Sequence, residues 1–288
     1  MNTLPKEHNL SSVRSKRRAN LTCVVCDSQQ QHQLSSRSPA GQIWRCTECG
    51  TAHTQQRIEV EAESTYDAMY FDGLNRYNDR EAELQKHFGV LLDIIEHRQS
   101  SGKLLDVGCG TGLLLTVARS RGFKVQGIEF SQYASSFART NHSLQITTGT
   151  ISSAASALNE RFDVITLNHV LEHLRDPRAD LKTLRGLLAP GGILVVGVPN
   201  FASAFQVVLR SRWPSLLPLE HLWHFTPGSL TRLLKECGLT SADVIAGDNH
   251  AYGKKIPSAL RWLWPGIDAL TRYRMRSDSI IALASTDT

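Results

Sequence analysis

A short apolar run followed by closely spaced glycines stands near the middle of the chain, from Leu104 to Gly112. Gly108, Gly110 and Gly112 occupy alternate positions, and a helical pattern begins at Leu113. Glycines permit a sharp turn from strand to helix and let a ligand approach the backbone closely. Free N–H groups at the start of the helix favour an anionic group. The segment therefore predicts a ligand-binding turn.

An acidic residue ends the next predicted strand. Glu129 follows the apolar run 124–128 and lies about 20 residues past the first glycine, where an acid can accept hydrogen bonds from both ribose hydroxyls. The glycine spacing is G-x-G-x-G and differs from the dinucleotide fingerprint G-x-G-x-x-G. Together these features favour an adenosine-type ligand with a small anionic end. The alternative is an ordinary strand–helix turn with a surface Glu.

Four of the six cysteines form two C-x-x-C pairs, Cys23 with Cys26 and Cys46 with Cys49. Each pair can offer two thiolates, and two such pairs close a tetrahedral Zn²⁺ site with no position left for water. We therefore predict a structural zinc ribbon over residues 21–57, after a flexible basic tail over residues 1–20. The alternatives are cysteines without metal and, for the tail, an arm that binds nucleic acid.

The composition fits one large domain with a small added module. The chain has 288 residues, 41% of them hydrophobic, and a formal net charge of +5, which permits an anionic partner without demanding nucleic acid. It has no apolar run of about 18 residues, so we expect no membrane-spanning helix. The polar N-terminus predicts no secretory signal. Paired thiols suit a reducing compartment, so we predict a cytoplasmic protein.

Five motifs, in order along the chain, resemble those of class I S-adenosylmethionine (SAM)-dependent methyltransferases. The last of them is similar to a box found in small-molecule and glycan methyltransferases of the ubiquinone-biosynthesis-like type. The resemblance covers about residues 60–285 and is more specific for the cofactor than for the substrate. The motifs are Asp106–Gly112, Gly127–Ser131, Phe162–Pro177, Pro190–Pro199 and His221–Pro227.

Strand and helix patterns alternate regularly, which predicts an α/β fold with a parallel sheet covered by helices on both faces. The resemblance implies a doubly wound, Rossmann-like, seven-stranded sheet whose last strand, around Ser279–Ala284, is antiparallel. A helical cap or linker is expected over residues 58–100 and the methyltransferase domain over residues 101–288. Within that domain, two aromatic-rich inserts, 201–221 and 251–276, are expected to form a substrate lid. The other strands are expected near 103–107, 124–128, 144–148, 162–167, 192–198 and 240–246.

The resemblance also implies how the cofactor is held. The glycine turn with Asp106 would cradle the methionine part, Glu129 would hold the ribose, and Phe130 would flank the adenine. Many family members carry an acid after the third strand that meets the adenine amino group, whereas Thr150 stands there in this chain, so backbone contacts would serve instead. The cap would contribute a tyrosine, Tyr70 or Tyr66, although a packing role is the alternative. The expected cofactor contacts are Asp106, Gly108, Cys109, Gly110, Gly112, Glu129, Phe130, Thr150, Ile151, Asn168 and Tyr70.

Methyl transfer to a hydroxyl also requires removal of a proton, and histidine is the usual base. Four histidines follow predicted strands on the ligand side of the sheet. We rank His221 first as the catalytic base, followed by His173 and His224, with His169 as a further candidate. The alternative is that Glu172 with His173, and His221 with His224, form a structural polar network beneath the lid.

The expected substrate is a small molecule that offers a hydroxyl, such as a sugar, a glycan or a secondary metabolite. Basic residues of the inserts suit an anionic acceptor, and the segment Arg261–Pro265 could contact a membrane if the acceptor is lipid-linked. The alternative is an RNA or protein methyltransferase that uses the ribbon and the basic tail for recognition. A zinc-dependent scaffold without activity is the third hypothesis. The basic residues are Arg210, Arg212, Lys254 and Lys255.

Overall fold

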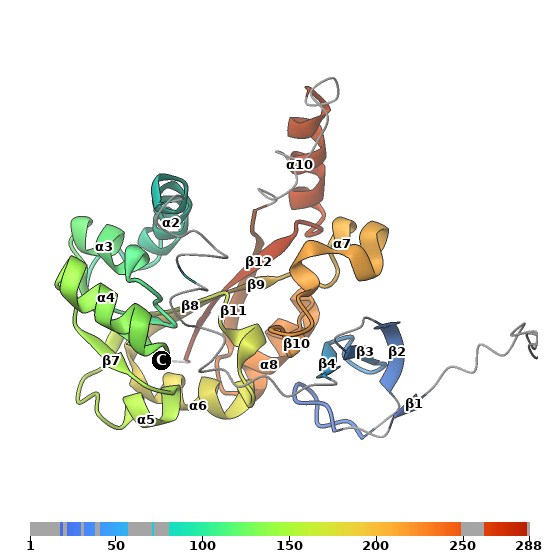
Figure 1. Ribbon diagram of the computed structural model, residues 1–288, viewed down its shortest axis with the longest axis horizontal. Coiled ribbons are helices and arrows are strands. Elements are labelled where there is room, and N and C mark those ends of the chain that lie inside the picture. The colour runs from blue at the N-terminus through green and yellow to red at the C-terminus, as the bar shows by residue number, and fades with distance from the viewer. Residues whose placement is uncertain are drawn as a thin grey trace, which may run out of the picture.

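The fold was analysed in a computed structural model, which describes residues 18–19, 22–29, 32–37, 41–56, 71, 81–248 and 262–286. Most of the predicted tail and about half of the helical cap lie outside the described residues, as does the stretch 249–261. The predictions for Tyr66, Tyr70, Lys254, Lys255 and Arg261 therefore fall outside the described residues. The described part contains a seven-stranded and a five-stranded sheet (Figure 1).

The seven-stranded sheet forms the body of the molecule and has the order β11-β12-β9-β8-β5-β6-β7. Its strands run parallel except for β12, which is antiparallel to both of its neighbours. The predicted α/β fold and its antiparallel last strand are confirmed. The strands are β5 (Lys103–Val107), β6 (Lys124–Glu129), β7 (Ile146–Thr148), β8 (Phe162–Asn168), β9 (Leu188–Pro199), β11 (Ser241–Ala246) and β12 (Ser279–Ser285).

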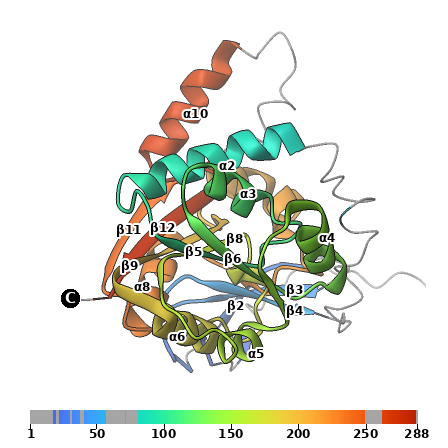
Figure 2. The same cartoon turned by 90° about the vertical axis from the view of Figure 1, so that its left-hand side faces the viewer.

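Helices cover both faces of this sheet. Neighbouring residues of a strand point to opposite faces, so an entirely apolar strand supplies a core on each side. Leu104 belongs to the apolar cluster beneath α2, α3 and α4, whereas Leu105 belongs to the cluster beneath α5, α6 and α8 (Figure 2). The strand ends near Gly108 and Asn168 are therefore held by a core on each side. The first set comprises α2 (Glu81–Glu96), α3 (Leu113–Ser120) and α4 (Gln132–His142), and the second α5 (Ile151–Ala155), α6 (Pro177–Leu187) and α8 (Pro227–Glu236).

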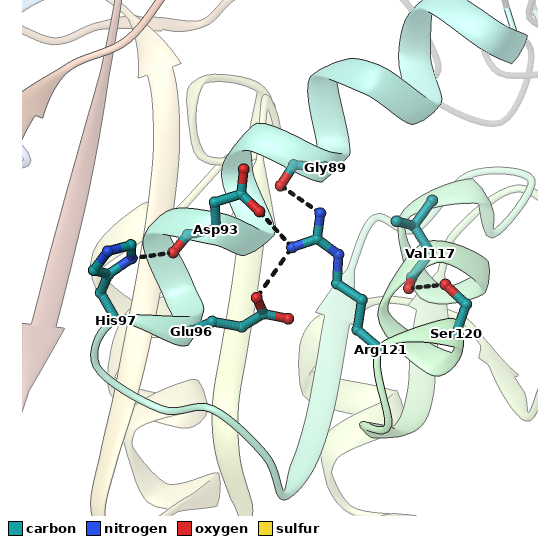
Figure 3. A network of polar contacts seen from close by, with 7 residues as sticks. All are labelled: Gly89, Asp93, Glu96, His97, Val117, Ser120 and Arg121. Atoms are coloured by element: carbon teal, nitrogen blue, oxygen red, sulfur yellow. Dashed lines mark hydrogen bonds and ion pairs between the residues drawn. The ribbon is translucent and has the colours of Figure 1, made fainter.

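Arg121, just past the end of α3, fastens α2 to the body (Figure 3). Its Nη1 donates to Asp93 at 2.6 Å and to Glu96 at 3.1 Å, and its Nη2 donates to the Gly89 carbonyl at 3.0 Å. At the end of α2, His97 Nδ1 donates to the Asp93 carbonyl. One guanidinium thus holds three points on α2, which fixes the helix that walls one side of the cleft described below.

The smaller sheet joins the cysteine-rich segment to the body formed by the seven-stranded sheet. Its order is β1-β2-β3-β4-β10, and β10 (Trp223–His224) comes from the box after the first insert. The Thr54 amide donates to the Leu222 carbonyl at 2.8 Å beside this pairing. From α6, Arg178 donates to the main-chain carbonyls of Val24 and Val25, which lie between the cysteines of the first pair, both at 3.0 Å. The other strands are β1 (Arg18–Ala19), β2 (His32–Arg37), β3 (Gly41–Cys46) and β4 (Ala52–Gln56).

The first insert packs tightly into this arrangement. It consists of α7 (Ala204–Leu209) and two short 3₁₀ turns, η4 (Arg210–Arg212) and η5 (Pro214–Leu216). Between them, the buried Trp213 donates from Nε1 to Asp278 at 2.6 Å. Trp213 also packs with Ile43 of the ribbon, so the insert is clamped between the ribbon and the end of the large sheet.

The described part of the second insert, by contrast, is largely exposed. Helix α10 (Trp264–Tyr273) projects away from the body, and Trp262 and Tyr273 are 75% and 87% exposed (Figure 1). Within the described residues, no helix combines the length and the apolar character that crossing a membrane requires.

Candidate active site

A large cleft of about 1410 Å³ opens where β5, β6 and β8 end. One part of its wall is the glycine turn with the ends of β6 and β7, and the opposite part comes from α2 and from residues 214–221 of the first insert. Ligands of open parallel sheets bind at this edge. The described residues 262–276 of the second insert do not contribute to the lining.

The glycine turn requires its glycines for two separate reasons. Gly108, Gly110 and Gly112 have φ values of 68°, 54° and 85°, a region that side chains disfavour. A Cβ on Gly108 would also lie 2.6 Å from Val170 Cγ2, and one on Gly112 would lie 2.4 Å from Leu144 Cδ1. The contact with Val170 brings the loop after β8 directly against the turn after β5.

Glu129 ends β6, as the sequence predicted, and its carboxylate bridges the ends of β5 and β6. Its two oxygens accept from the Gly110 and Ser131 amides, each at 2.7 Å. Burial raises the pKa of Glu129, while these main-chain hydrogen bonds oppose that shift. A buried carboxylate at the carboxyl edge of two adjacent strands is well placed to accept hydroxyl donors from a ligand.

Asp106 lies beneath the glycine turn and accepts a hydrogen bond from Thr166 Oγ1 at 2.6 Å. Burial raises the pKa of Asp106 to about 7, the Thr166 hydroxyl opposes the shift, and the charge of Glu129 adds to it. A cationic ligand placed here would favour the ionised carboxylate.

The remaining predicted cofactor residues lie around the same part of the cleft, and Phe130, Thr150, Ile151 and Asn168 all line it. The Thr150 hydroxyl accepts from the Ser153 amide and caps α5, so its role there is structural. Cys109 also lines the cleft, but its sulfur lies under β6, 2.6 Å from where a Gly127 Cβ would stand.

His169 lines the cleft directly after β8 and pairs with Glu172, which is buried and does not belong to the cleft lining. The Nδ1 of His169 and the Oε1 of Glu172 are 3.2 Å apart, and the side chains are 47% and 1% exposed. Burial opposes a charge on His169, but the hydrogen bond and the charge of Glu172 outweigh it, so the pKa of His169 is raised. Burial likewise opposes ionisation of Glu172, but the surrounding imidazoles lower its pKa to about 2. His169 has a left-handed φ of 58°.

The other three histidines differ in their access to the cleft. His173 and His221 line it, and their Nδ1 atoms donate to the carbonyls of Glu220 at 3.1 Å and Ser215 at 2.9 Å. Burial lowers the pKa of His221 to about 4. His224 is absent from the lining; its Nε2 is 2.8 Å from Thr54 Oγ1 of the ribbon, and burial lowers its pKa to about 3.

Two cleft residues, His87 and Asp248, had no signal in the sequence pattern, whereas Phe71 belongs to the aromatic group that the pattern showed in the cap. Nδ1 of His87, in α2, lies 2.9 Å from Oδ2 of Asp248, after β11. The buried Phe71 lies 3.4 Å from where a Gly110 Cβ would stand. These residues belong to segments far apart in the chain, and no local spacing links them. Buried Phe71 lies one residue beyond the predicted Tyr70, within the same aromatic group of the cap.

The cysteine pairs come together at one point of the ribbon. The sulfurs of Cys23 and Cys49 are 3.6 Å apart, those of Cys26 and Cys46 are 3.8 Å apart, and all four lie within 4.8 Å of one another. A tetrahedral zinc with Zn–S bonds of about 2.3 Å separates its sulfurs by about 3.8 Å. The thiols are free, and their geometry fits the predicted metal.

Comparison with known proteins agrees with this geometry. A family model described as a methyltransferase domain matches residues 77–244. A ubiquinone biosynthesis O-methyltransferase of Stutzerimonas stutzeri is 30% identical over 187 residues, 59% of this chain and 81% of that protein. The enzyme of the same name from Dinoroseobacter shibae is 35% identical over 49% of this chain and 61% of its own length.

Solved structures of low sequence identity share the fold. A SAM-dependent methyltransferase from Archaeoglobus fulgidus has a TM-score of 0.53 at 16% identity, covering 76% of this chain and 99% of that one. The Haemonchus contortus phosphoethanolamine N-methyltransferase 2, in complex with SAM, has a TM-score of 0.56 at 13% identity, covering 88% of this chain and 71% of that one. With the glycine turn and the matched family domain, these likenesses identify the chain as a member of the class I SAM-dependent methyltransferases.

Proposed function

We propose that this methyltransferase transfers the methyl group of SAM to a hydroxyl oxygen of a small molecule. The observation that carries the proposal is that His169, which lines the cleft beside the glycine turn, pairs with the buried Glu172. Similarity to enzymes named ubiquinone biosynthesis O-methyltransferases supports an oxygen as the acceptor atom.

In this proposal the cofactor occupies the part of the cleft next to Gly110. Glu129 accepts its ribose hydroxyls, Asp106 faces its cationic methionine part, and Phe130 and Ile151 flank its adenine. When bound, SAM supplies a methyl group activated by its sulfonium, so in-line attack by an oxygen forms the C–O bond as the C–S bond breaks and leaves a neutral thioether.

His169 is the general base that receives the proton of the acceptor hydroxyl. Nδ1 of His169 donates to Glu172, which leaves Nε2 to accept the proton, and the carboxylate stabilises the resulting imidazolium. This assignment changes the order expected from the sequence, in which His221 came first. His221 is buried and its pKa is lowered to about 4, and His224 does not line the cleft, so both are weaker candidates. His173, which does line the cleft, remains the second candidate.

The charge of the cleft favours a neutral or cationic acceptor over an anionic one. Away from the cofactor residues, Arg175 is the only Arg or Lys in the described lining, which carries several carboxylates. Arg210 and Arg212, expected to meet an anionic acceptor, lie outside that lining. The carboxylates are Glu83, Asp176, Asp180, Glu220 and Asp248.

The four ribbon cysteines hold a structural Zn²⁺ ion in this proposal. The distances between their sulfurs match a tetrahedral thiolate site, and such a site has no position open for substrate. The ion would stabilise the ribbon strands, of which β4 pairs with β10. Through this pairing it would fix the position of the box that contains His221.

A labelled-methyl transfer screen tests the proposed acceptor. Wild-type protein with methyl-labelled SAM would be offered phenols and catechols, neutral sugars, nucleotide sugars and RNA, and the methylated atom identified by mass spectrometry. We expect O-methylation of a hydroxyl compound that carries no negative charge. Labelling of RNA bases alone, or of an amino nitrogen alone, would contradict the proposal, and Glu129→Ala protein serves as the control for cofactor-dependent labelling.

A further inference from the structure

Three side chains with metal-binding atoms converge beside the part of the cleft lined by His169, which is called the acceptor side here because the proposed function places the acceptor there. Glu172 and His173 belong to the 3₁₀ turn η3 (Leu171–His173) after β8, and His221 comes from the box after the first insert. One ligand atom from each lies within 4.8 Å of the other two. The Leu222 amide donates to the Glu172 carbonyl at 2.8 Å, which ties the two segments together.

The hydrogen bonds of the two histidines set their tautomers. The Nδ1 of His221 lies 2.9 Å from the Ser215 carbonyl, and that of His173 lies 3.1 Å from the Glu220 carbonyl. A carbonyl only accepts, so each neutral ring carries its proton on Nδ1 and its lone pair on Nε2. Metal-binding histidines show this arrangement, with the second nitrogen held by a carbonyl or a carboxylate.

The carboxylate of Glu172 is left incompletely partnered. Its side chain is 1% exposed, and Oε2 accepts no hydrogen bond from any described residue. Oε1 lies 3.9 Å from Nε2 of His221, so a buried anionic oxygen faces a nitrogen lone pair. Buried polar atoms without a partner are costly, and two electron-rich atoms facing each other call for a positive species between them.

A structural network is the competing explanation. The bond between His169 and Oε1 of Glu172 satisfies one oxygen, and a water molecule could satisfy the other. This explanation accounts for the hydrogen bond to His169. It leaves unexplained why both His173 and His221 direct Nδ1 to carbonyls and keep Nε2 as the acceptor atom.

We propose that Glu172, His173 and His221 bind one divalent transition-metal ion in the wall of the cleft. Two imidazoles and one carboxylate favour Zn²⁺, Fe²⁺, Co²⁺ or Ni²⁺ over Mg²⁺ or Ca²⁺, which prefer all-oxygen sites. Metal bonds of about 2.0–2.2 Å bring ligand atoms closer than they stand here, so His173, the most exposed of the three, moves inward on binding. Three protein ligands leave positions open towards the cleft.

The open positions would receive the acceptor. A hydroxyl oxygen on the metal loses its proton more readily, and a neighbouring oxygen of the same molecule would complete a chelate. His169 stays hydrogen-bonded to the metal-bound carboxylate and takes the proton. This role rests on the proposed function, whereas binding of the metal does not, and it selects acceptors with two adjacent oxygens, such as catechols or vicinal diols.

Titration with Co²⁺ tests the binding site directly. The probe is added to full-length protein whose ribbon is already loaded with Zn²⁺, and the visible spectrum is recorded. We expect ligand-field bands that saturate at one further ion per chain, without the thiolate charge-transfer band that displacement of zinc from the cysteines would produce. His221→Ala and Glu172→Gln should weaken Co²⁺ binding by about 100-fold or more, since changes even to outer-shell partners cost 10–100-fold.

The exposed His97→Ala is the matched control and should bind Co²⁺ as the wild type does. If His221→Ala fails to fold, His173→Asn, at a more exposed ligand, takes its place. The proposed site would be overturned if wild-type protein bound no further Co²⁺ ion, or if folded variants at the ligand residues bound Co²⁺ as tightly as the wild type. Binding of S-adenosylhomocysteine is measured in the same samples. Intact binding there, with no Co²⁺ bound, would overturn the metal site and leave the proposed function standing.

Discussion

At the scale of single residues, the cleft depends on positions that accept one residue type. Gly108 combines a φ of 68° with a close approach to Val170, so any side chain there is excluded both by its backbone and by its neighbour. Its contact also sets the distance between the cofactor turn and the loop that carries His169.

We expect Gly108→Ala to destabilise the fold by about 1–3 kcal/mol and to abolish measurable SAM binding. The added methyl would push Val170 and the loop after β8 away from the turn. Urea unfolding and calorimetry measure the two effects. Gly228→Ala, where no atom lies within 4 Å of the new Cβ, is the control and should be neutral or stabilising by up to about 1 kcal/mol. Normal SAM affinity in Gly108→Ala would refute this account of the turn.

Asp106 gives the cleft a dependence on pH. Its pKa of about 7 in the empty fold lies above the ordinary value of 3.8, so below pH 7 the empty site holds a proton that the cation of the cofactor displaces. SAM affinity should therefore rise with pH towards 7, by up to about tenfold per unit, and level off above it. Calorimetry between pH 5.5 and 7.5 measures this slope. Asp106→Asn should remove the slope, and an identical slope in that variant would rule out Asp106 as its source.

At the scale of elements, the box that ends in β10 is held by the ribbon. Thr54 pairs its hydroxyl with Nε2 of the buried His224, and Thr51 donates to the carbonyl of the same residue at 3.2 Å. The short strand β10 has two residues, so these side-chain bonds supply much of what fixes its position.

Replacing Thr54 by Val should leave Nε2 of His224 buried without a partner, at a cost of about 1–3 kcal/mol in the free energy of unfolding. Hydrogen exchange should then speed up at the amides around Leu222 and His224. Thr231→Val, whose hydroxyl bonds to a carbonyl of its own helix at 3.0 Å, should change stability by less than about 0.5 kcal/mol. Equal stability of the two variants would show that the Thr54 bond holds nothing in place.

Local patterns were enough to predict most of these elements. The strand ends at Val107, Glu129 and Asn168 follow from apolar runs bounded by glycines or polar residues. The pairing of β4 with β10 had no such signal, because it joins residues about 170 positions apart through main-chain bonds that any sequence could make.

At the scale of the whole molecule, the ribbon and the large sheet contribute to one apolar core. Cys23, Val25 and Cys46 belong to the same apolar cluster as residues of β8 and α8, and Ile43 packs against the first insert. A module predicted from its cysteines as a separate domain thus packs into the core of the body, although none of its described residues lines the cleft.

Removal of the ribbon zinc should therefore disturb the part of the cleft near His221 more than the part formed by the glycine turn and Glu129. A structural zinc contributes on the order of 10 kcal/mol to such a ribbon, so a chelator should unfold it and release β10. Hydrogen exchange should increase in residues 41–56 and 221–225, while the amides of β5 and β6 stay protected. Chelated, zinc-free protein with unchanged protection at β4 would show that the ribbon does not need the metal.

The candidate site divides at this scale into a predictable and an unpredictable half. The cofactor side follows from one turn and one acid, Gly108–Gly112 and Glu129, because a parallel sheet brings adjacent strand ends together. The ranking of the histidines could not be predicted, because it depends on burial. Sequence spacing treats His169 and His221 alike, whereas the fold leaves the first 47% exposed and buries the second.

The most direct test of the account is the rate of methyl transfer in His169→Gln, measured in a single turnover at saturating SAM with the best hydroxyl acceptor of the screen. Loss of the base should slow transfer by about 10²–10⁴-fold while the affinity for SAM stays that of the wild type. His97→Gln, at an exposed position just past the end of α2, should react at the wild-type rate. A His169→Gln enzyme that transfers methyl as fast as the wild type would contradict the proposal that this residue removes the proton.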